Sequence, residues 1–84
     1  MTLSELAHEV ATRNDLVAFL KALNADFTAN RGAWSNARLE TFLEAMAAWV
    51  EDMDGYYENR GESLVTLPAW RVLADILVAA RVYV

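Results

Sequence analysis

The stretch WSNARLETFLEAMAAWVEDMDGYY, Trp34 to Tyr57, decides the fold. Its large apolar residues recur three and four positions apart, which places them along one stripe of an α-helix. These residues are Leu39, Phe42, Leu43, Met46, Trp49, Val50, Met53 and Tyr57. Because a stripe of this size must be buried, the sequence predicts a long amphipathic helix near 36–58.

The opposite face of this helix contains nearly all of the charge imbalance of the protein. Six acidic residues stand against a single arginine, Arg38, so the stretch contributes −5, and the whole chain is also −5. The acidic residues are Glu40, Glu44, Glu51, Asp52, Asp54 and Glu58. One interpretation is a solvated face that like charges keep soluble. The other is a docking surface for a basic partner, because such a field speeds encounter and sets specificity.

Length and composition describe a single domain, residues 1–84, in which more than half of the residues are apolar. The absence of cysteine excludes a disulfide framework and thiol chemistry. The seven basic residues are scattered and the chain is acidic overall, which argues against direct nucleic-acid binding. No run is long and apolar enough to cross a membrane, and the first residues lack a signal-peptide pattern. A cytoplasmic location is therefore expected.

Capping residues indicate where the other helices begin. Thr2 and Glu5 fit a capping box ahead of an apolar face, which predicts a short first helix. Asn14 or Asp15 is expected to cap a second helix. Pro68 is expected to open the last helix, because the first helical turn does not use the amide that proline lacks.

The ends of the central helix are also predicted from local signals. Ser35 or Asn36 is expected to cap its start, with Trp34 packing on Leu39 as a hydrophobic staple. Gly61 is expected to close its end in the left-handed conformation. The sequence therefore predicts an all-α fold, a compact bundle of four helices in which the third and fourth supply most of the core. The predicted helices lie near 3–11, 15–31, 36–58 and 68–82.

The last predicted helix is apolar around most of its circumference. Its apolar residues include Trp70, Val72, Leu73, Ile76, Leu77, Ala79, Ala80, Tyr83 and Val84. Such a helix is either central in its domain or buried in an oligomer interface, so a homodimer is an alternative to simple central packing. Asp75 is its one acidic residue, and Arg71 one turn earlier is the local partner expected for it. If the carboxylate is buried, a distant arginine or a tryptophan indole is the alternative partner.

Motifs for catalysis or metal binding are incomplete. His8 is the only histidine, and Thr12 stands where a zinc-protease motif needs a second one, so His8 is expected on the surface. A calcium-loop register set by Gly55 puts Val50 at the first ligand position and Gly61 at that of the bidentate glutamate. No serine has a nucleophile motif, and no glycine-rich phosphate loop is present. The protein is therefore not expected to be an enzyme or to hold a metal or cofactor.

Several motifs together resemble a family of small bacterial proteins known only as a domain of unknown function. They are the run from Trp34 to Trp49, then Asp52, Trp70-Arg71, Leu73-Ala74, and Ala79-Ala80 followed by Tyr83. The family pattern reads Trp-Glu-Asn, Leu or Ile, Phe-Leu-Glu-Ala, Ala-Trp and Asp, with a closing Ala-Ala-x-x-Tyr. The resemblance covers about two thirds of the chain and implies no catalytic or binding residues. Ser35 replaces the usual glutamate, and Val84 replaces an acidic residue that often follows the last tyrosine.

The pattern of an asparagine before a leucine-rich helix that ends in tryptophan also resembles, faintly, the nuclease inhibitor barstar. Barstar contains parallel strands, which have no counterpart in this sequence. The likeness serves as a model for how a small acidic protein blocks a basic enzyme site.

The function expected from these observations is a non-enzymatic interaction with a basic protein through the 36–58 helix, as in an immunity protein, an inhibitor or a nucleic-acid mimic. Tyr56 and Tyr57 are adjacent and cannot share a helical face, so one is expected near the acidic side chains, a composition typical of a binding hot spot. The expected contact residues are Glu40, Glu44, Glu51, Asp52, Asp54, Tyr56 and Glu58. The alternative is an assembly module that homo-oligomerises through the apolar C-terminal helix.

Overall fold

The computed structural model describes residues 1–84 and contains four α-helices, one 3-10 turn and no strand. This confirms the predicted all-α fold of four helices. In chain order the elements are α1 (Leu3–His8), α2 (Arg13–Ala29), η1 (Arg31–Ala33), α3 (Leu39–Asn59) and α4 (Ala69–Ala80).

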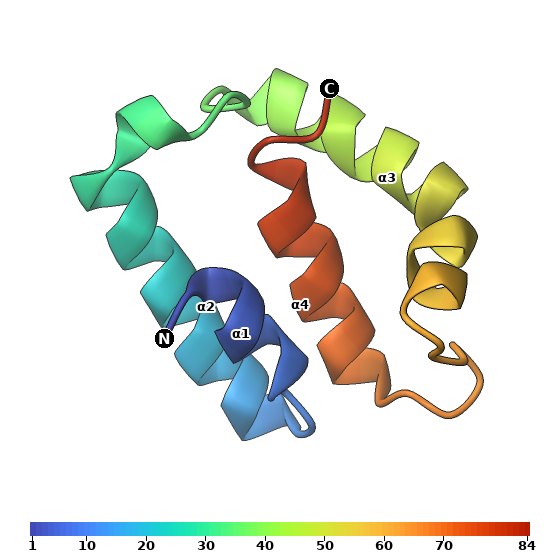
Figure 1. Cartoon of the computed structure of the whole chain (residues 1–84). Helices are drawn as coiled ribbons and strands as arrows, with labels where there is room; N and C mark the ends of the chain where they lie inside the picture. Colours follow the sequence, from blue (N-terminus) through green and yellow to red (C-terminus); the bar gives the residue numbers. More distant parts are fainter.

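Helix α4 is the centre of the molecule. It contacts α1 and α2 on one side and α3 on the other, whereas α2 and α3 make no backbone contact (Figure 1). Three helices of the same chain pack on α4, which accounts for apolar residues around most of its circumference. Neither α4 nor any other helix has the length and apolar character needed to cross a membrane.

The main core lies between α4 and the α1–α2 pair. Its buried residues are Ala7, Val10, Leu16, Phe19, Leu23, Trp34, Ala74 and Val78. Helix α3 buries Ala45, Trp49 and Tyr57 outside this cluster. Helices α3 and α4 together supply six of the twelve buried apolar residues and α2 supplies three, so the prediction that the third and fourth helices supply most of the core is only partly met.

Helices α1 and α2 differ from their predicted bounds because Thr12 is a cap. Its hydroxyl oxygen accepts a hydrogen bond from the Asp15 amide at 3.1 Å, and the Asp15 carboxylate accepts one from the Thr12 amide at 3.2 Å. This capping box starts α2 at Arg13, not after Asn14 or Asp15 as predicted. Because Thr12 is extended, α1 cannot continue to residue 11 and ends at His8. The box predicted at Thr2 is confirmed.

Helix α3 begins at Leu39, three residues later than predicted, and Arg38 occupies the cap position without a side-chain hydrogen bond. Its end near residue 59 is confirmed, and Gly61 has the positive φ of 70° that the sequence predicts. Pro68 precedes α4, which starts at Ala69 and ends at Ala80, two residues earlier than predicted.

The late start of α3 follows from contacts that hold the segment before it. The Asn36 side-chain amide donates to the carbonyl oxygens of Ala80 at 3.0 Å and Tyr83 at 2.8 Å. The backbone amide of Asn36 donates to the carbonyl oxygen of Arg81 at 2.9 Å. Asn36 therefore supplies hydrogen-bond donors to the carbonyl oxygens at the C-terminal end of α4 and does not cap α3. Trp34 stacks on Phe42 in the first turn of α3, with ring centroids 5.8 Å apart.

Candidate functional site

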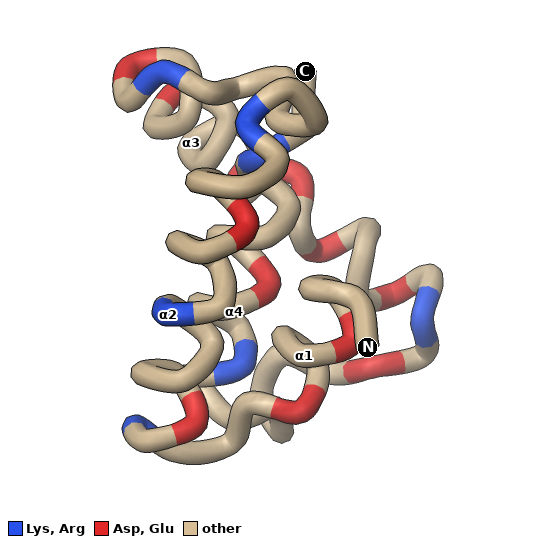
Figure 2. Tube along the Cα trace, turned by 90° about the vertical axis from the view of Figure 1, so that its left-hand side faces the viewer, with Lys and Arg blue, Asp and Glu red and all other residues tan.

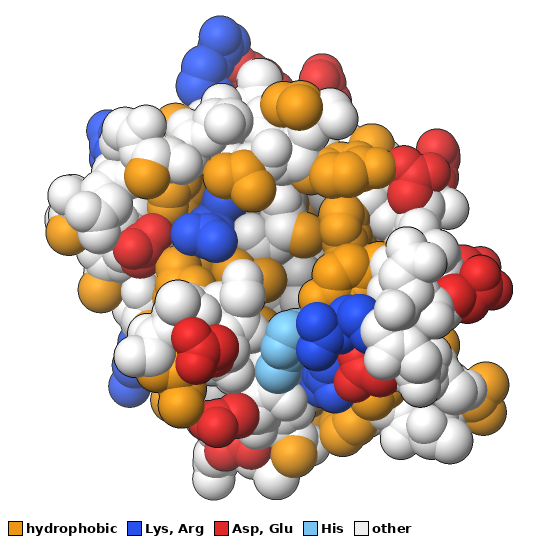
Figure 3. Space-filling model, viewed as in Figure 1, with side chains coloured by type: hydrophobic (Ala, Val, Ile, Leu, Met, Phe, Trp, Pro, Cys, Tyr) orange, Lys and Arg blue, Asp and Glu red, His pale blue; other side chains and the backbone are white.

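Five acidic residues form one stripe along α3, which we call the acidic stripe. At about 100° of turn per residue, their positions fall within an arc of roughly 80° on the helix circumference. The members are Glu40, Glu44, Glu51, Asp54 and Glu58, and all of them are exposed. Figure 3 shows acidic side chains along the outer edge of α3, on the side away from α4.

The acidic stripe has almost no basic counterpart within the chain. Lys and Arg are distributed over several elements (Figure 2), and Arg38 is the only one that forms an ion pair with the stripe, through Glu40. Like charges three or four residues apart on a helix cost about 0.2–0.5 kcal/mol per pair. Glu58 also lies in the last turn of α3, where the helix dipole disfavours a carboxylate. Glu40 is favourably placed in the first turn, but the other four carboxylates of the stripe do not stabilise the helix that contains them.

Two of the seven predicted contact residues lie away from the acidic stripe. Asp52 is exposed on another part of the circumference, and its carboxylate accepts a hydrogen bond from the hydroxyl of Tyr83. That hydrogen bond raises the pKa of Tyr83. Tyr56 points toward His8, with 3.1 Å between its hydroxyl oxygen and His8 Nε2. The structure thus brings five of the predicted residues together and separates these two.

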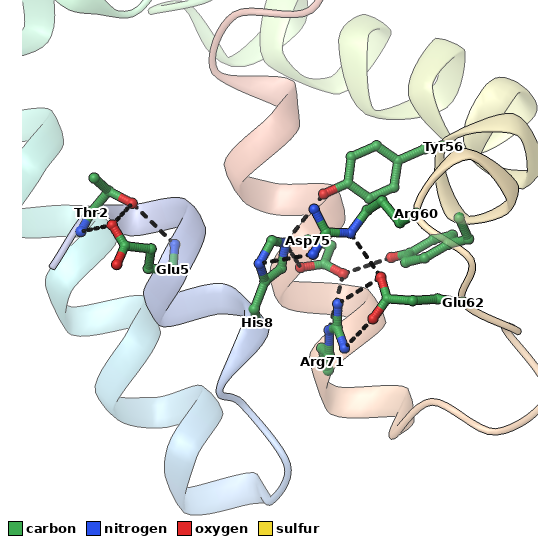
Figure 4. Close-up of polar contacts among 9 residues, drawn as sticks. Thr2, Glu5, His8, Tyr56, Arg60, Glu62, Arg71 and Asp75 are labelled. Atoms are coloured by element: carbon green, nitrogen blue, oxygen red, sulfur yellow. Dashed lines mark hydrogen bonds and ion pairs between the residues drawn. The ribbon is translucent and has the colours of Figure 1, made fainter.

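A cluster of polar side chains, which we call the polar cluster, joins α1, α3, α4 and the connection between the last two helices (Figure 4). Its members are His8, Tyr56, Tyr57, Arg60, Glu62, Arg71 and Asp75. Its most buried members are Tyr57 and Asp75, which are 1% and 2% exposed. The Tyr57 hydroxyl donates to Asp75 Oδ2 at 2.7 Å. Burial is the main cause that raises the pKa of Asp75, and the hydrogen bond from Tyr57 opposes it. Burial and then the Asp75 carboxylate raise the pKa of Tyr57.

The cations beside Asp75 are shared with other groups. Arg71 Nε lies 3.5 Å from Asp75 Oδ2 without forming a hydrogen bond, while Arg71 Nη1 lies 2.8 Å from Glu62 Oε2. Arg60 Nε also donates to Glu62, at 2.8 Å. The hydrogen bonds from Arg60 and then Arg71 lower the pKa of Glu62. The expected local pair of Asp75 with Arg71 is therefore present, but Arg71 makes its shorter ion pair with Glu62.

His8 was expected on the surface; in the structure it is partly exposed and belongs to the polar cluster. Arg60 Nη2 approaches His8 Nδ1 to 3.5 Å, and because a guanidinium only donates, this contact fits the neutral tautomer in which Nδ1 accepts and Nε2 holds the hydrogen. His8 Nε2 is the nitrogen that faces both Tyr56 and, at 3.8 Å, Asp75 Oδ1. A catalytic triad instead uses one ring nitrogen for the nucleophile and the other for the carboxylate. The arrangement is therefore a link between helices and not a triad.

Sequence reasoning singled out Asp75 but left its burial open, and it did not include the Tyr57 hydroxyl among the partners expected for it. Asp75 and Tyr57 are 18 positions apart, and His8 and Tyr56 are 48 apart, so no local spacing relates them. The available signal was the adjacency of Tyr56 and Tyr57, which had to point in different directions. In the structure both contribute to the polar cluster, with Tyr57 buried and Tyr56 half-buried.

The fold and these two groups of residues define a small all-α domain with a charged outer helix and an internally paired polar cluster. The chain belongs to DUF7660, a family of unknown function, whose family model matches residues 12–84. The match begins at the cap of α2 and extends through α3 and α4, so α1 and His8 precede it. No curated protein and no solved structure matches the chain. The predicted resemblance to a domain family of unknown function is thereby confirmed.

Proposed function

We propose that this protein is an interaction module that presents the acidic stripe of α3 to a basic protein partner, in the manner of an immunity protein, an inhibitor or a nucleic-acid mimic. The observation that supports this proposal is the alignment of five exposed carboxylates on one helix, four of them without an ion-pair partner. A basic surface brought against them would relieve repulsion that the free protein contains.

The energetic cost of the stripe favours docking over a purely solubilising role. Carboxylates distributed over several helices would give the same net charge without placing like charges one turn apart. The stripe also includes Glu58 at the unfavourable end of the helix dipole. A local arrangement that costs stability without a compensating contact is typical of a functional surface.

The proposal is tested by capturing partners from an extract of the source organism at low and moderate salt. The stripe variant is Glu44→Gln, Glu51→Gln and Asp54→Asn. The matched control is Glu9→Gln, Ala25→Lys and Thr28→Lys, which changes exposed residues just after α1 and on α2. Each variant raises the net charge from −5 to −2, the control by removing one carboxylate and adding two lysines, so the net charges match while the acidic stripe stays intact in the control.

We expect basic proteins to be retained by the wild type and by the control, to be released by salt, and to be lost with the stripe variant. A purified captured protein should then bind the stripe variant at least tenfold more weakly in calorimetry. Retention of the same proteins by both variants would show that the acidic residues serve solubility alone.

The packing of α4 limits the residues through which the alternative function, homo-oligomerisation, could occur. Helix α4 packs on the other three helices, and Trp70 and Leu73 are its exposed large residues. Self-association through α4 would therefore depend on these two side chains. Sedimentation of the wild type and of a Trp70→Gln, Leu73→Gln variant at micromolar concentration tests it, since a monomeric wild type excludes this alternative.

A further inference from the structure

Beside the acidic stripe, α3 has a second, apolar stripe whose large residues remain exposed. Leu39, Leu43 and Val50 are 73%, 52% and 41% exposed. They are four and seven residues apart, so they lie on one side of the helix, between its buried face and the acidic stripe. Large apolar residues gathered on one surface of a small protein mark an interaction site more often than residues scattered singly. We call these three residues the apolar seam.

At the start of α3 the apolar seam opens into a groove of about 440 Å³. Its apolar lining comes from α2 on one side and from Trp34 and the first turn of α3 on the other, namely Leu20, Leu23 and Phe27 opposite Trp34, Leu39 and Phe42. Leu39 belongs to both the groove and the apolar seam. The groove exists because α2 and α3 both pack on α4 with their backbones apart. It offers a pocket for one large apolar side chain of a partner, the usual form of an energetic anchor.

The charge of α3 decides which occupant fits. A second copy of this chain docked on the apolar seam would bring its own acidic stripe beside the first, and juxtaposed like charges disfavour association. A partner with Lys and Arg next to its apolar residues would neutralise the stripe and cover the apolar seam together. Helices present this combination naturally, because residues three, four and seven apart align on one face.

We infer that the partner docks as a basic amphipathic helix along α3, with apolar residues on the apolar seam, a large one in the groove, and cations opposite the acidic stripe. This inference rests on the proposed function and adds the shape and chemistry of the partner. The 21 residues of α3 give it a length of about 30 Å, which a helix of similar length covers fully.

The test uses two fluorescent peptides of about 20 residues, a length that matches α3. One peptide has leucine and lysine spaced to form an amphipathic helix, and the other has the same composition in an order without amphipathic periodicity. Binding is measured by fluorescence anisotropy to the wild type, to the stripe variant, and to a seam variant with Leu39→Gln, Leu43→Gln and Val50→Gln. Val17→Gln, Val65→Gln and Val82→Gln form the matched control, because these residues are also exposed and apolar but lie outside α3.

We expect the patterned peptide to bind the wild type and the control at least tenfold more tightly than the scrambled one, and the seam variant to lose this preference. Equal binding of both peptides, abolished only in the stripe variant, would overturn the helical partner while leaving the acidic docking surface intact. Absence of binding by either peptide would overturn the inference, and the extract experiment would still judge the proposed function separately. Dimerisation that disappears in the seam variant would identify a second copy as the occupant and would also overturn it.

Discussion

The hydroxyl of Tyr57 donates a 2.7 Å hydrogen bond to Oδ2 of Asp75, which joins the last turns of α3 to the middle of α4 inside the protein. The other oxygen, Oδ1, has no hydrogen-bond partner, and His8 Nε2 lies 3.8 Å from it. Arg71 is closest to the oxygen that Tyr57 already binds. The hydroxyl of Tyr57 is thus the one hydrogen-bond donor to a carboxylate that is almost completely removed from water.

Tyr57→Phe should therefore destabilise the protein by about 1–3 kcal/mol, because it leaves a buried carboxylate without its hydrogen bond. The pKa of Asp75 should rise further, since the lost hydrogen bond was lowering it. Urea unfolding and an NMR titration of the Asp75 carboxyl carbon measure the two effects. Tyr83→Phe is the control: it removes a hydroxyl bonded to the exposed Asp52 and should change stability by less than about 0.5 kcal/mol. Equal losses in the two variants would contradict the importance of burial.

Asp75→Asn should change how stability depends on pH. Burial raises the pKa of Asp75 in the folded state, so between its unfolded and folded pKa values the folded protein binds more protons than the unfolded chain. The wild type therefore loses stability as the pH rises from about 4 through the folded pKa. Asparagine does not titrate, and its carbonyl oxygen still accepts from Tyr57. The stability of the variant relative to the wild type should thus increase over that range and then level off, as measured by urea unfolding at a series of pH values. A difference that stays constant with pH would show that Asp75 has an ordinary pKa.

The existence and type of the four helices could be predicted because the signals for them are local. Apolar spacing along α3 and the capping box at Thr2 depend on neighbours within a few residues. The position of Gly61 after α3 was predictable for the same reason. Helix starts were predicted less well, since Thr12, Asn14 and Asp15 are all good caps and only the path of the chain after α1 selects Thr12.

Asn36 shows why features that depend on contacts between distant residues were not predictable from the sequence. Local rules treat an asparagine ahead of an apolar stripe as a cap, but this one binds carbonyl oxygens 44 and 47 positions away. The five members of the acidic stripe were predicted because they share a helix, whereas the groove beside Leu39 depends on the separation of α2 and α3 on opposite sides of α4. Features set by the relative position of helices leave no periodic signal in the sequence.

Asn36→Ala should cost about 2–3 kcal/mol, because two side-chain hydrogen bonds are lost and the carbonyl oxygens of Ala80 and Tyr83 lose their donor. Hydrogen exchange should become faster at the amides of Val82 and Tyr83, which bond to Ala79 at the end of α4. Urea unfolding gives the first effect and NMR hydrogen exchange the second. Asn14→Ala, at an exposed position near the start of α2, is the control and should change stability by less than about 0.5 kcal/mol. Unchanged hydrogen exchange at the C-terminal end would show that the hydrogen bonds of Asn36 do not hold that end in place.

Gly55 and Gly61 should respond to the same substitution with opposite signs. Gly55 lies within α3 and Gly61 just after it, and an added methyl group meets no atom within 4 Å at either position. Gly55→Ala should stabilise the protein by about 0.5–1 kcal/mol, since alanine loses less conformational entropy than glycine when a helix forms. Gly61→Ala should destabilise it by about 1–2 kcal/mol, because the φ of 70° is strained for a residue with a side chain. Urea unfolding of both variants measures the two changes. Because packing is open at both sites, shifts of the same sign would mean that backbone conformation does not control the end of α3.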